Sequence, residues 1–305
     1  MKIAEGAFFL CLSLSRITIP ESVEHLGYQA FGKCYSLKKV IFRDGIRRFG
    51  GSVFCEDRSL SEVILPQTLE RIGSDCFHNC VALREIDIPE SLSELGAYAF
   101  RGCEGLTSFH FKRDLSNAEE MHKETPFEGC SSLKEYYLDY GVTRADWLPS
   151  APALISINVP ADHPLFTSID GVLYSKDKRT LLRVPTGYAG EFILPRGVYT
   201  IAPNAFCNCS KITEVILPSS LQKIDTGAFL GCSSLRSVNF PGRLTEVGDK
   251  AFEGCTELAR VHISSSVQRI GEGTFASCPA LRDISISPEN KAYRLEGEKI
   301  MPACD

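Results

Sequence analysis

The chain has 305 residues, of which 44% are hydrophobic, and this length suffices for a large buried core. The formal net charge of -5 is small and the charged residues are scattered, so the sequence lacks the basic surface of a nucleic-acid-binding protein. No apolar run approaches the roughly 18 residues that a membrane helix needs, and we expect no membrane span.

The first residues resemble a short secretory signal peptide, because Met1 and Lys2 precede the apolar run at residues 7–12. We reject that interpretation. Phe8, Cys11 and Leu14 fall on a spacing that recurs through the rest of the chain, which a removed leader has no reason to follow. The segment is therefore the first repeat, and we expect no signal peptide in this chain.

The repeat is 23 residues long and is clearest in residues 72–94 and 224–246. Its sixth place is aromatic in every repeat but one, where Leu148 replaces it: Phe8, Phe31, Phe54, Phe77, Phe100, Phe127, Phe206, Phe229, Phe252 and Phe275. Its ninth place is a cysteine, replaced only by Asp57 and Ala151: Cys11, Cys34, Cys80, Cys103, Cys130, Cys209, Cys232, Cys255 and Cys278. A leucine or isoleucine follows three residues later. This gives about eleven repeats.

Each repeat is too short to bury its own apolar face, so the repeats must stack and share one core. The pattern L-x-x-I-x-I predicts a strand in each repeat. Around Ile86, Asp87 and Ile88, for example, the isoleucines point one way and the aspartate the other. Stacked repeats then form a parallel sheet. The proline that follows many of the strands ends their pairing.

The sequence of the repeat resembles the BspA-like leucine-rich repeats, as in the run Gly96 to Cys103, G-A-Y-A-F-R-G-C. The resemblance implies a right-handed leucine-rich-repeat superhelix, with the parallel sheet on its concave face and turns or short helical or strand segments on its convex face. It also implies adhesion at a cell surface, and it supplies no catalytic residues. We expect one continuous domain over residues 1–305.

Two segments depart from the repeat. Within residues 161–190 the stretch from Phe166 to Leu182 predicts a β-hairpin that turns near residues 176–178, after which the solenoid resumes. Residues 288–300 loosely repeat the opening of this insertion, with Tyr293 and Gly297 in the places of Phe166 and Gly171. Both chain ends interrupt a repeat, so we expect that the chain is a piece of a longer protein.

The thirteen cysteines raise the question of metal ions, disulfides and catalysis. The best metal candidates are two groups: Cys76, His78 and Cys80, and separately Cys207 and Cys209. Cys80 and Cys209 are already explained by the column of ninth-place cysteines, and no second ligand pair lies at zinc-finger distance. Parallel Cβ directions disfavour disulfides within the column. No catalytic motif is present. We therefore expect no metal, no cofactor and no enzyme activity.

The remaining candidate is the row of strand residues that point out of the core at the sixteenth place. This row is chemically variable beside constant core places, as a binding surface requires. The ten residues proposed for binding are Ile41, Ile64, Asp87, His110, Tyr137, Asn158, Ile193, Ile216, Asn239 and His262. The flanking fourteenth place is acidic in the middle of the chain, at residues such as Glu62 and Glu85.

Two functions fit these observations. The first is a non-catalytic module, expected to be monomeric, that binds a protein or a glycan through the concave sheet, at a cell surface if the chain is excised from a longer exported protein and in the cytoplasm otherwise. The second is a structural or spacer segment of a longer surface protein. An enzyme hidden in the insertion is a third and weaker alternative. The sequence does not identify the partner.

Overall fold

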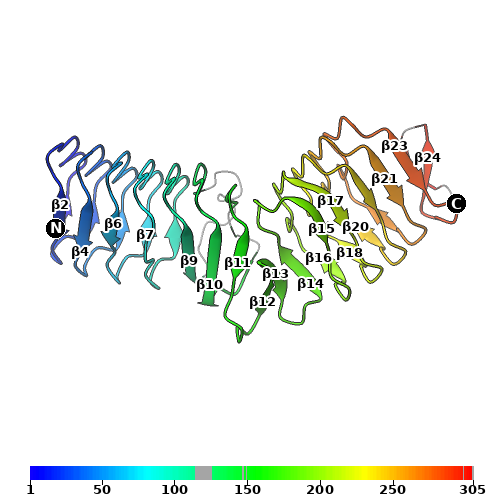
Figure 1. The fold of residues 1–305 in the computed structure, drawn as a ribbon, viewed down its shortest axis with the longest axis horizontal. Helices are drawn as coiled ribbons and strands as arrows, with labels where there is room; N and C mark the ends of the chain where they lie inside the picture. The colour runs from blue at the N-terminus through cyan, green and yellow to red at the C-terminus, as the bar shows by residue number, and fades with distance from the viewer. Residues whose placement is uncertain (114–125, 146–147, 149, 298, 304–305) are drawn as a thin grey trace. The chain divides into compact units, whose positions relative to one another are not determined.

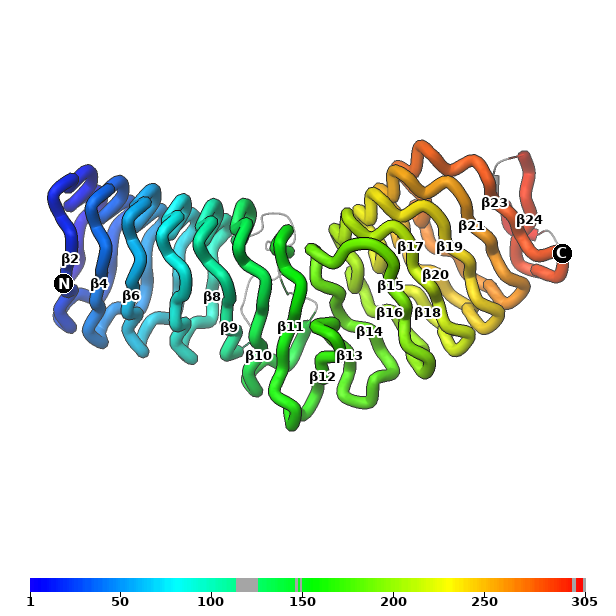
Figure 2. The backbone as a smooth tube through the Cα atoms, in the orientation of Figure 1, coloured from blue at the N-terminus to red at the C-terminus, as the bar shows by residue number. Residues whose placement is uncertain are grey.

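The structure is a computed structural model that describes residues 1–113, 126–145, 148, 150–297 and 299–303. It divides into two compact units, residues 1–163 and 164–305. The described residues form strands and turns and include no helix. Successive coils stack side by side within each unit, as the backbone trace shows (Figure 2).

In the first unit, the predicted strands form two parallel three-stranded sheets (Figure 1). Their long strands are β2 (Arg16–Ile19), β4 (Lys39–Phe42), β6 (Glu62–Ile64), β9 (Ser108–Arg113), β10 (Glu135–Gly141) and β11 (Ser156–Asn158). Equivalent residues of neighbouring repeats pair in register, as Ile41 does with Ile64. Because β2, β4 and β6 pair residues 23 apart, the periodicity of the sequence becomes the register of their sheet.

Residues 85–88 differ from the prediction. Ile86 and Ile88 are buried and Asp87 is exposed, so the alternation of side chains is as expected. The segment nevertheless belongs to neither sheet, and the ladder is interrupted between β6 and β9. The prediction of a paired strand here was wrong. The inward isoleucines indicate only that the segment packs on the core, and this packing continues without hydrogen bonds to the neighbouring strands.

The first unit also contains a five-stranded parallel sheet, which we call the short-strand sheet because its strands have two residues each. These are β1 (Lys2–Ile3), β3 (His25–Leu26), β5 (Arg48–Phe49), β7 (Arg71–Ile72) and β8 (Glu94–Leu95). A glycine follows most of these strands. Gly73 is required by close approach, because a Cβ there would lie 2.5 Å from the carbonyl oxygen of Gly50 on the preceding coil.

The second unit repeats this architecture. Its long strands are β15 (Gly190–Ile193), β17 (Ile212–Ile216), β19 (Ser237–Asn239), β21 (Arg260–Ile263) and β23 (Asp283–Ile286). Its short parallel strands are β16 (Thr200–Ile201), β18 (Lys223–Ile224), β20 (Glu246–Val247) and β22 (Arg269–Ile270). Both sets face one continuous core.

The insertion is a three-stranded antiparallel sheet rather than a single hairpin. It consists of β12 (Phe166–Ile169), β13 (Val172–Ser175) and β14 (Thr180–Arg183). The predicted turn at residues 176–178 is present, and a second turn lies at Asp170 and Gly171, which both have positive φ. Strand β14 then pairs in parallel with β16, so the insertion extends the short-strand sheet. At the C-terminus β24 (Tyr293–Glu296) and β25 (Lys299–Pro302) form a similar hairpin.

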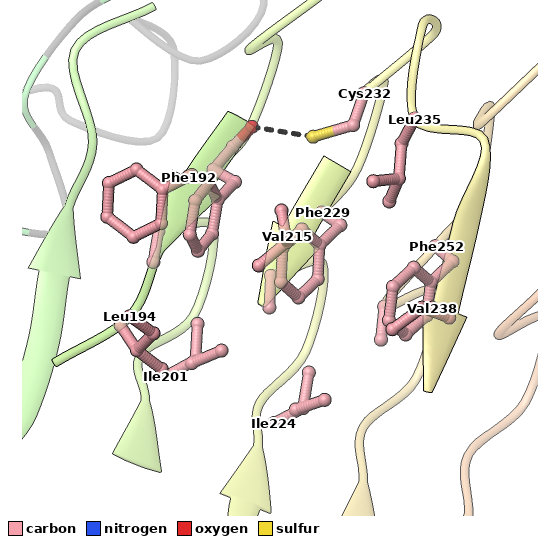
Figure 3. Packing of buried hydrophobic residues seen from close by; sticks show 14 of the residues in the cluster. Phe192, Leu194, Ile201, Val215, Ile224, Phe229, Cys232, Leu235, Val238 and Phe252 are labelled. Atoms are coloured by element: carbon pink, nitrogen blue, oxygen red, sulfur yellow. Dashed lines mark hydrogen bonds between the residues drawn. The ribbon is translucent and has the colours of Figure 1, made fainter. Parts of the chain in front are cut away.

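The sixth-place aromatics form a stacked ladder in the core of each unit. Phe54 and Phe77 have ring centroids 5.3 Å apart, and Phe77 and Phe100 lie 5.1 Å apart. In the second unit Phe229 and Phe252 stack at 4.8 Å, beneath the apolar residues of the strands (Figure 3). Each ring contacts the equivalent ring of the next coil, so the ladder ties neighbouring repeats together.

The ninth-place cysteines of the inner coils are buried thiols that hydrogen-bond between coils, whereas Cys11 and Cys278 in the end coils are partly exposed. The Sγ of Cys103 donates to the carbonyl oxygen of Phe77 at 3.0 Å, and Cys232 donates to Phe206 at 3.2 Å (Figure 3). All cysteines of the described residues are free thiols. This bond explains the residue type, because the place requires a small apolar group that also carries a donor. Cys304 lies outside the described residues.

Candidate functional site

The outward row of the long strands is the candidate binding face, and we call it the outward face. It consists of the ten residues proposed from the sequence. Seven are exposed: Ile64, Asp87, His110, Ile193, Ile216, Asn239 and His262. Three are half-buried: Ile41, Tyr137 and Asn158. The structure therefore directs all ten away from the core, as the alternation predicts.

Strand register brings these residues together in short runs on each unit. In the first unit Ile41 pairs with Ile64, and His110 pairs with Tyr137. Ile64 is 45% exposed, and the ring centroids of His110 and Tyr137 lie 4.5 Å apart in a stacked arrangement. This places an aliphatic pair and an aromatic pair on the same face, one on each side of the interrupted ladder.

The second unit has its own apolar pair. Ile193 is 63% exposed and Ile216 is 44% exposed, and the two residues pair across β15 and β17. Asn239 and His262 follow on β19 and β21, where Nδ1 of His262 lies 2.9 Å from the Ser285 hydroxyl. The exposed aliphatic residues are thus not confined to the N-terminal half of the chain.

A recess of about 410 Å³ opens where the ladder of the first unit is interrupted. We call it the acidic recess. It is lined by Ser61, Glu62, Val63, Glu85, Ile86, Asp87, Ser108 and His110. Sequence reasoning found the outward residues and the acidic fourteenth place but not the recess, since residues 85–88 carry the same alternation as their paired neighbours.

Three carboxylates line the acidic recess, and two of them are paired with lysines, so its uncompensated charge comes from Glu85. Lys39 pairs with Glu62, and the Nζ of Lys112 lies 2.9 Å from the Asp87 carboxylate. Glu85 forms no ion pair with any of the described residues. The Asp87 side chain is 79% exposed despite its partner. The recess therefore offers a carboxylate surface to a cationic group.

The hydroxyl of Tyr137 is oriented by a neighbour on its own strand. It donates a hydrogen bond to Glu135 Oε2 at 2.6 Å, and this bond raises the pKa of Tyr137. The stacked pair therefore lies on the outward face with the Tyr137 hydroxyl already hydrogen-bonded and the His110 ring exposed.

The non-column cysteines provide a test for catalysis. Cys55 Sγ lies 3.7 Å from His78 Nδ1, and the same nitrogen lies 4.0 Å from the Asp75 carboxylate. A relay requires the acid and the thiol on different ring nitrogens, so this trio is not arranged as a triad. Burial, with contributions from Glu56 and Asp75, raises the pKa of Cys55 to about 11. The thiolate is therefore disfavoured.

The metal candidates from the sequence are not assembled into a site. Cys76 and Cys80 are fully buried, whereas His78 is directed toward Cys55. Cys209 belongs to the buried column, and Cys207 is only partly exposed. Within the described ranges no three His, Cys, Asp or Glu residues gather as metal ligands.

No helix among the described residues is long and apolar enough to cross a membrane.

Stacked coils, parallel sheets and a repeated apolar core define this protein as a leucine-rich-repeat solenoid. The BspA type leucine rich repeat region matches six copies over residues 1–107, 49–162 and 188–295. The chain belongs to this family. Among curated proteins, none matches the chain by sequence.

Solved structures with the same fold support this assignment. A leucine-rich repeat protein from Eubacterium ventriosum matches with a TM-score of 0.57 and 19% identity, over 90% of this chain and 67% of that protein. The pneumococcal vaccine antigen PcpA matches with a TM-score of 0.54 and 21% identity, over 94% of this chain and 72% of that protein. At these identities the likeness is one of fold.

Proposed function

We propose that the chain is a non-catalytic binding module that holds a protein partner on its outward face. The family and the fold are those of repeat modules that present extended surfaces. The observation that carries the proposal is the arrangement on the first unit, where exposed Ile64 and its neighbour Ile41 lie beside the acidic recess.

The chemistry of this face favours a partner segment that combines a basic and an apolar side chain. A lysine or arginine fits the recess because Glu85 has no ion pair within the described residues and Asp87 stays exposed. An aliphatic or aromatic side chain next to it packs on Ile41 and Ile64. Buried apolar anchors of this kind commonly contribute about 2 kcal/mol or more each to binding.

A place at the cell surface is part of the proposal. One solved structure with this fold is a vaccine antigen, and surface exposure would give the outward face access to host or neighbouring-cell proteins. Adhesion is the function that combines an extended solenoid with a partner-binding face. A purely structural or spacer role is the alternative.

Selection from a displayed peptide library tests this proposal. The full chain serves as the target, and the variant Ile41→Ser, Ile64→Ser and Tyr137→Ala is used to remove peptides that bind elsewhere. We expect enriched peptides with a lysine or arginine beside an apolar residue. Failure to enrich any peptide that binds the wild type but not the variant would favour the spacer role, and enrichment of acidic peptides would contradict the assignment of the recess.

A further inference from the structure

The short-strand sheet of the first unit carries a column of basic residues in register. Lys2 pairs with His25, His25 with Arg48, and Arg48 with Arg71. All four side chains are exposed. Arg48 and Arg71 are like charges placed directly opposite each other on neighbouring strands, an arrangement that destabilises a sheet, and we therefore looked for a functional reason for it.

Most of the column lacks an acidic partner. Arg71 forms an ion pair with Glu94 at 3.3 Å, and the nearby Glu70 is held by Arg47. Within the described residues, neither Lys2 nor Arg48 forms an ion pair. The positive charge of the column is therefore largely uncompensated.

The second unit provides an internal comparison at the same places of the repeat. There Lys223 is followed by Glu246 and then Arg269 in register. Glu246 pairs with Lys223 at 3.7 Å and with Arg269 at 2.6 Å. The fold thus accommodates an alternating, neutralised column, which shows that the fold itself does not require the run of cations in the first unit.

A shallow groove of about 580 Å³ runs along the cationic column, and we call it the short-strand groove. It is lined by Lys2, His25, Leu26, Gly27, Tyr28, Arg48, Phe49, Gly50, Gly51, Arg71, Gly73 and Ser74. Four of its lining residues are glycines, and at Gly50 the chain lies against the preceding coil so closely that a Cβ would come within 2.9 Å of the Leu26 carbonyl oxygen. A narrow chain can therefore lie beside the cations.

We propose that the short-strand groove binds a sulfated polysaccharide laid along the stack of coils. Lys2, Arg48 and Arg71 lie along the stack at steps set by the strand spacing of about 4.8 Å, so a linear polyanion that crosses the strands can reach all three. Arginine suits sulfate because its planar guanidinium donates two parallel hydrogen bonds.

Single-stranded nucleic acid is the competing polyanion, and the groove disfavours it. Proteins that bind such strands place successive bases on aromatic side chains. The groove has one exposed aromatic residue, Tyr28, which is 49% exposed. This site is separate from the outward face, so its test does not depend on the proposed function.

A fluorescent heparin oligosaccharide is the probe, titrated into the full chain at low and physiological salt. The groove variant is Arg48→Gln with Arg71→Gln, and the matched control is Lys223→Gln with Arg269→Gln, which removes the same charge from the neutralised column. We expect the groove variant to weaken binding by about tenfold or more and the control to change it little, with steep salt dependence. Melting curves establish that both variants fold.

Equal weakening in both variants, or unchanged binding in the groove variant, would overturn the site. Equal binding of a desulfated oligosaccharide would overturn the role of sulfate. Tighter, groove-dependent binding of single-stranded DNA would assign the groove to nucleic acid instead. The outward-face variant should bind the heparin oligosaccharide as the wild type does.

Discussion

A carboxylic acid, Asp57, occupies one place of the cysteine column. Asp57 is fully buried, and its Oδ1 accepts a hydrogen bond from the Cys34 amide at 2.7 Å. Its Oδ2 is buried without a hydrogen-bond partner among the described residues. Burial is the main cause that raises the pKa of Asp57, to about 8. The carboxyl is therefore mostly protonated in the folded state at neutral pH.

This pKa predicts a pH-dependent stability that is specific to Asp57. The folded pKa of Asp57 is raised above its unfolded value, so the folded state holds this proton more tightly than the unfolded state does. The resulting contribution of protonated Asp57 to the free energy of unfolding is complete below about pH 4. It is lost as the pH rises to about 8, by up to ~1.4 kcal/mol per pH unit. Asp57→Cys should remove this loss and restore the column thiol. Denaturant unfolding of both proteins from pH 5 to pH 8 measures it, and parallel pH profiles would show that Asp57 does not titrate in this range.

The cysteine column also shows what residue-level reasoning from the sequence can and cannot supply. The period and apolar surroundings predict small buried thiols, as observed for Cys103. They do not predict the bond from Cys103 to the Phe77 carbonyl oxygen, because its acceptor belongs to the backbone of another coil. The same limit applies to Cys55 and His78, whose proximity arises only when the coils are stacked.

At the scale of elements, the long strands were predictable because an L-x-x-I-x-I pattern spans a whole strand. The second sheet was not predicted as a sheet, since a strand such as Arg48–Phe49 offers only one polar and one apolar residue to detect. The insertion was predicted only in part. The turn at residues 176–178 was expected, but the two-residue turn at Asp170 and Gly171, which joins the first two strands, was not. The break at residues 85–88 leaves no mark in the alternation.

The close stacking of the short strands makes a second prediction, on Gly73. An alanine Cβ would lie 2.5 Å from the Gly50 carbonyl oxygen, so the two coils must move apart. Gly73→Ala should therefore destabilise the protein by about 1–3 kcal/mol. The matched control is Gly242→Ala, whose Cβ would meet nothing within 4 Å. Thermal melting compares the two variants, and an equal effect would mean that the sheet has room at Gly73.

At the scale of the whole molecule, the chain offers two surfaces of different chemistry on the first unit. The outward face combines exposed aliphatic residues with the acidic recess, and the short-strand groove carries cations. The family and the fold followed from the sequence because every repeat contributes the same core pattern. The partner does not follow, because it depends on the variable places, which the repeat leaves unconstrained.

The central claim is that the partner binds the outward face of the first unit, and calorimetric titration of a peptide selected on the full chain tests it most directly. The comparison is between the Ile41→Ser, Ile64→Ser, Tyr137→Ala variant and a control altered in the insertion, Lys178→Ala with Arg179→Ala. Because each lost anchor is worth about 2 kcal/mol, we expect the first variant to lose nearly all affinity while its melting temperature barely changes, and the control to bind as the wild type does. Loss of binding only in the insertion variant, or equal affinity in all three proteins, would contradict the claim.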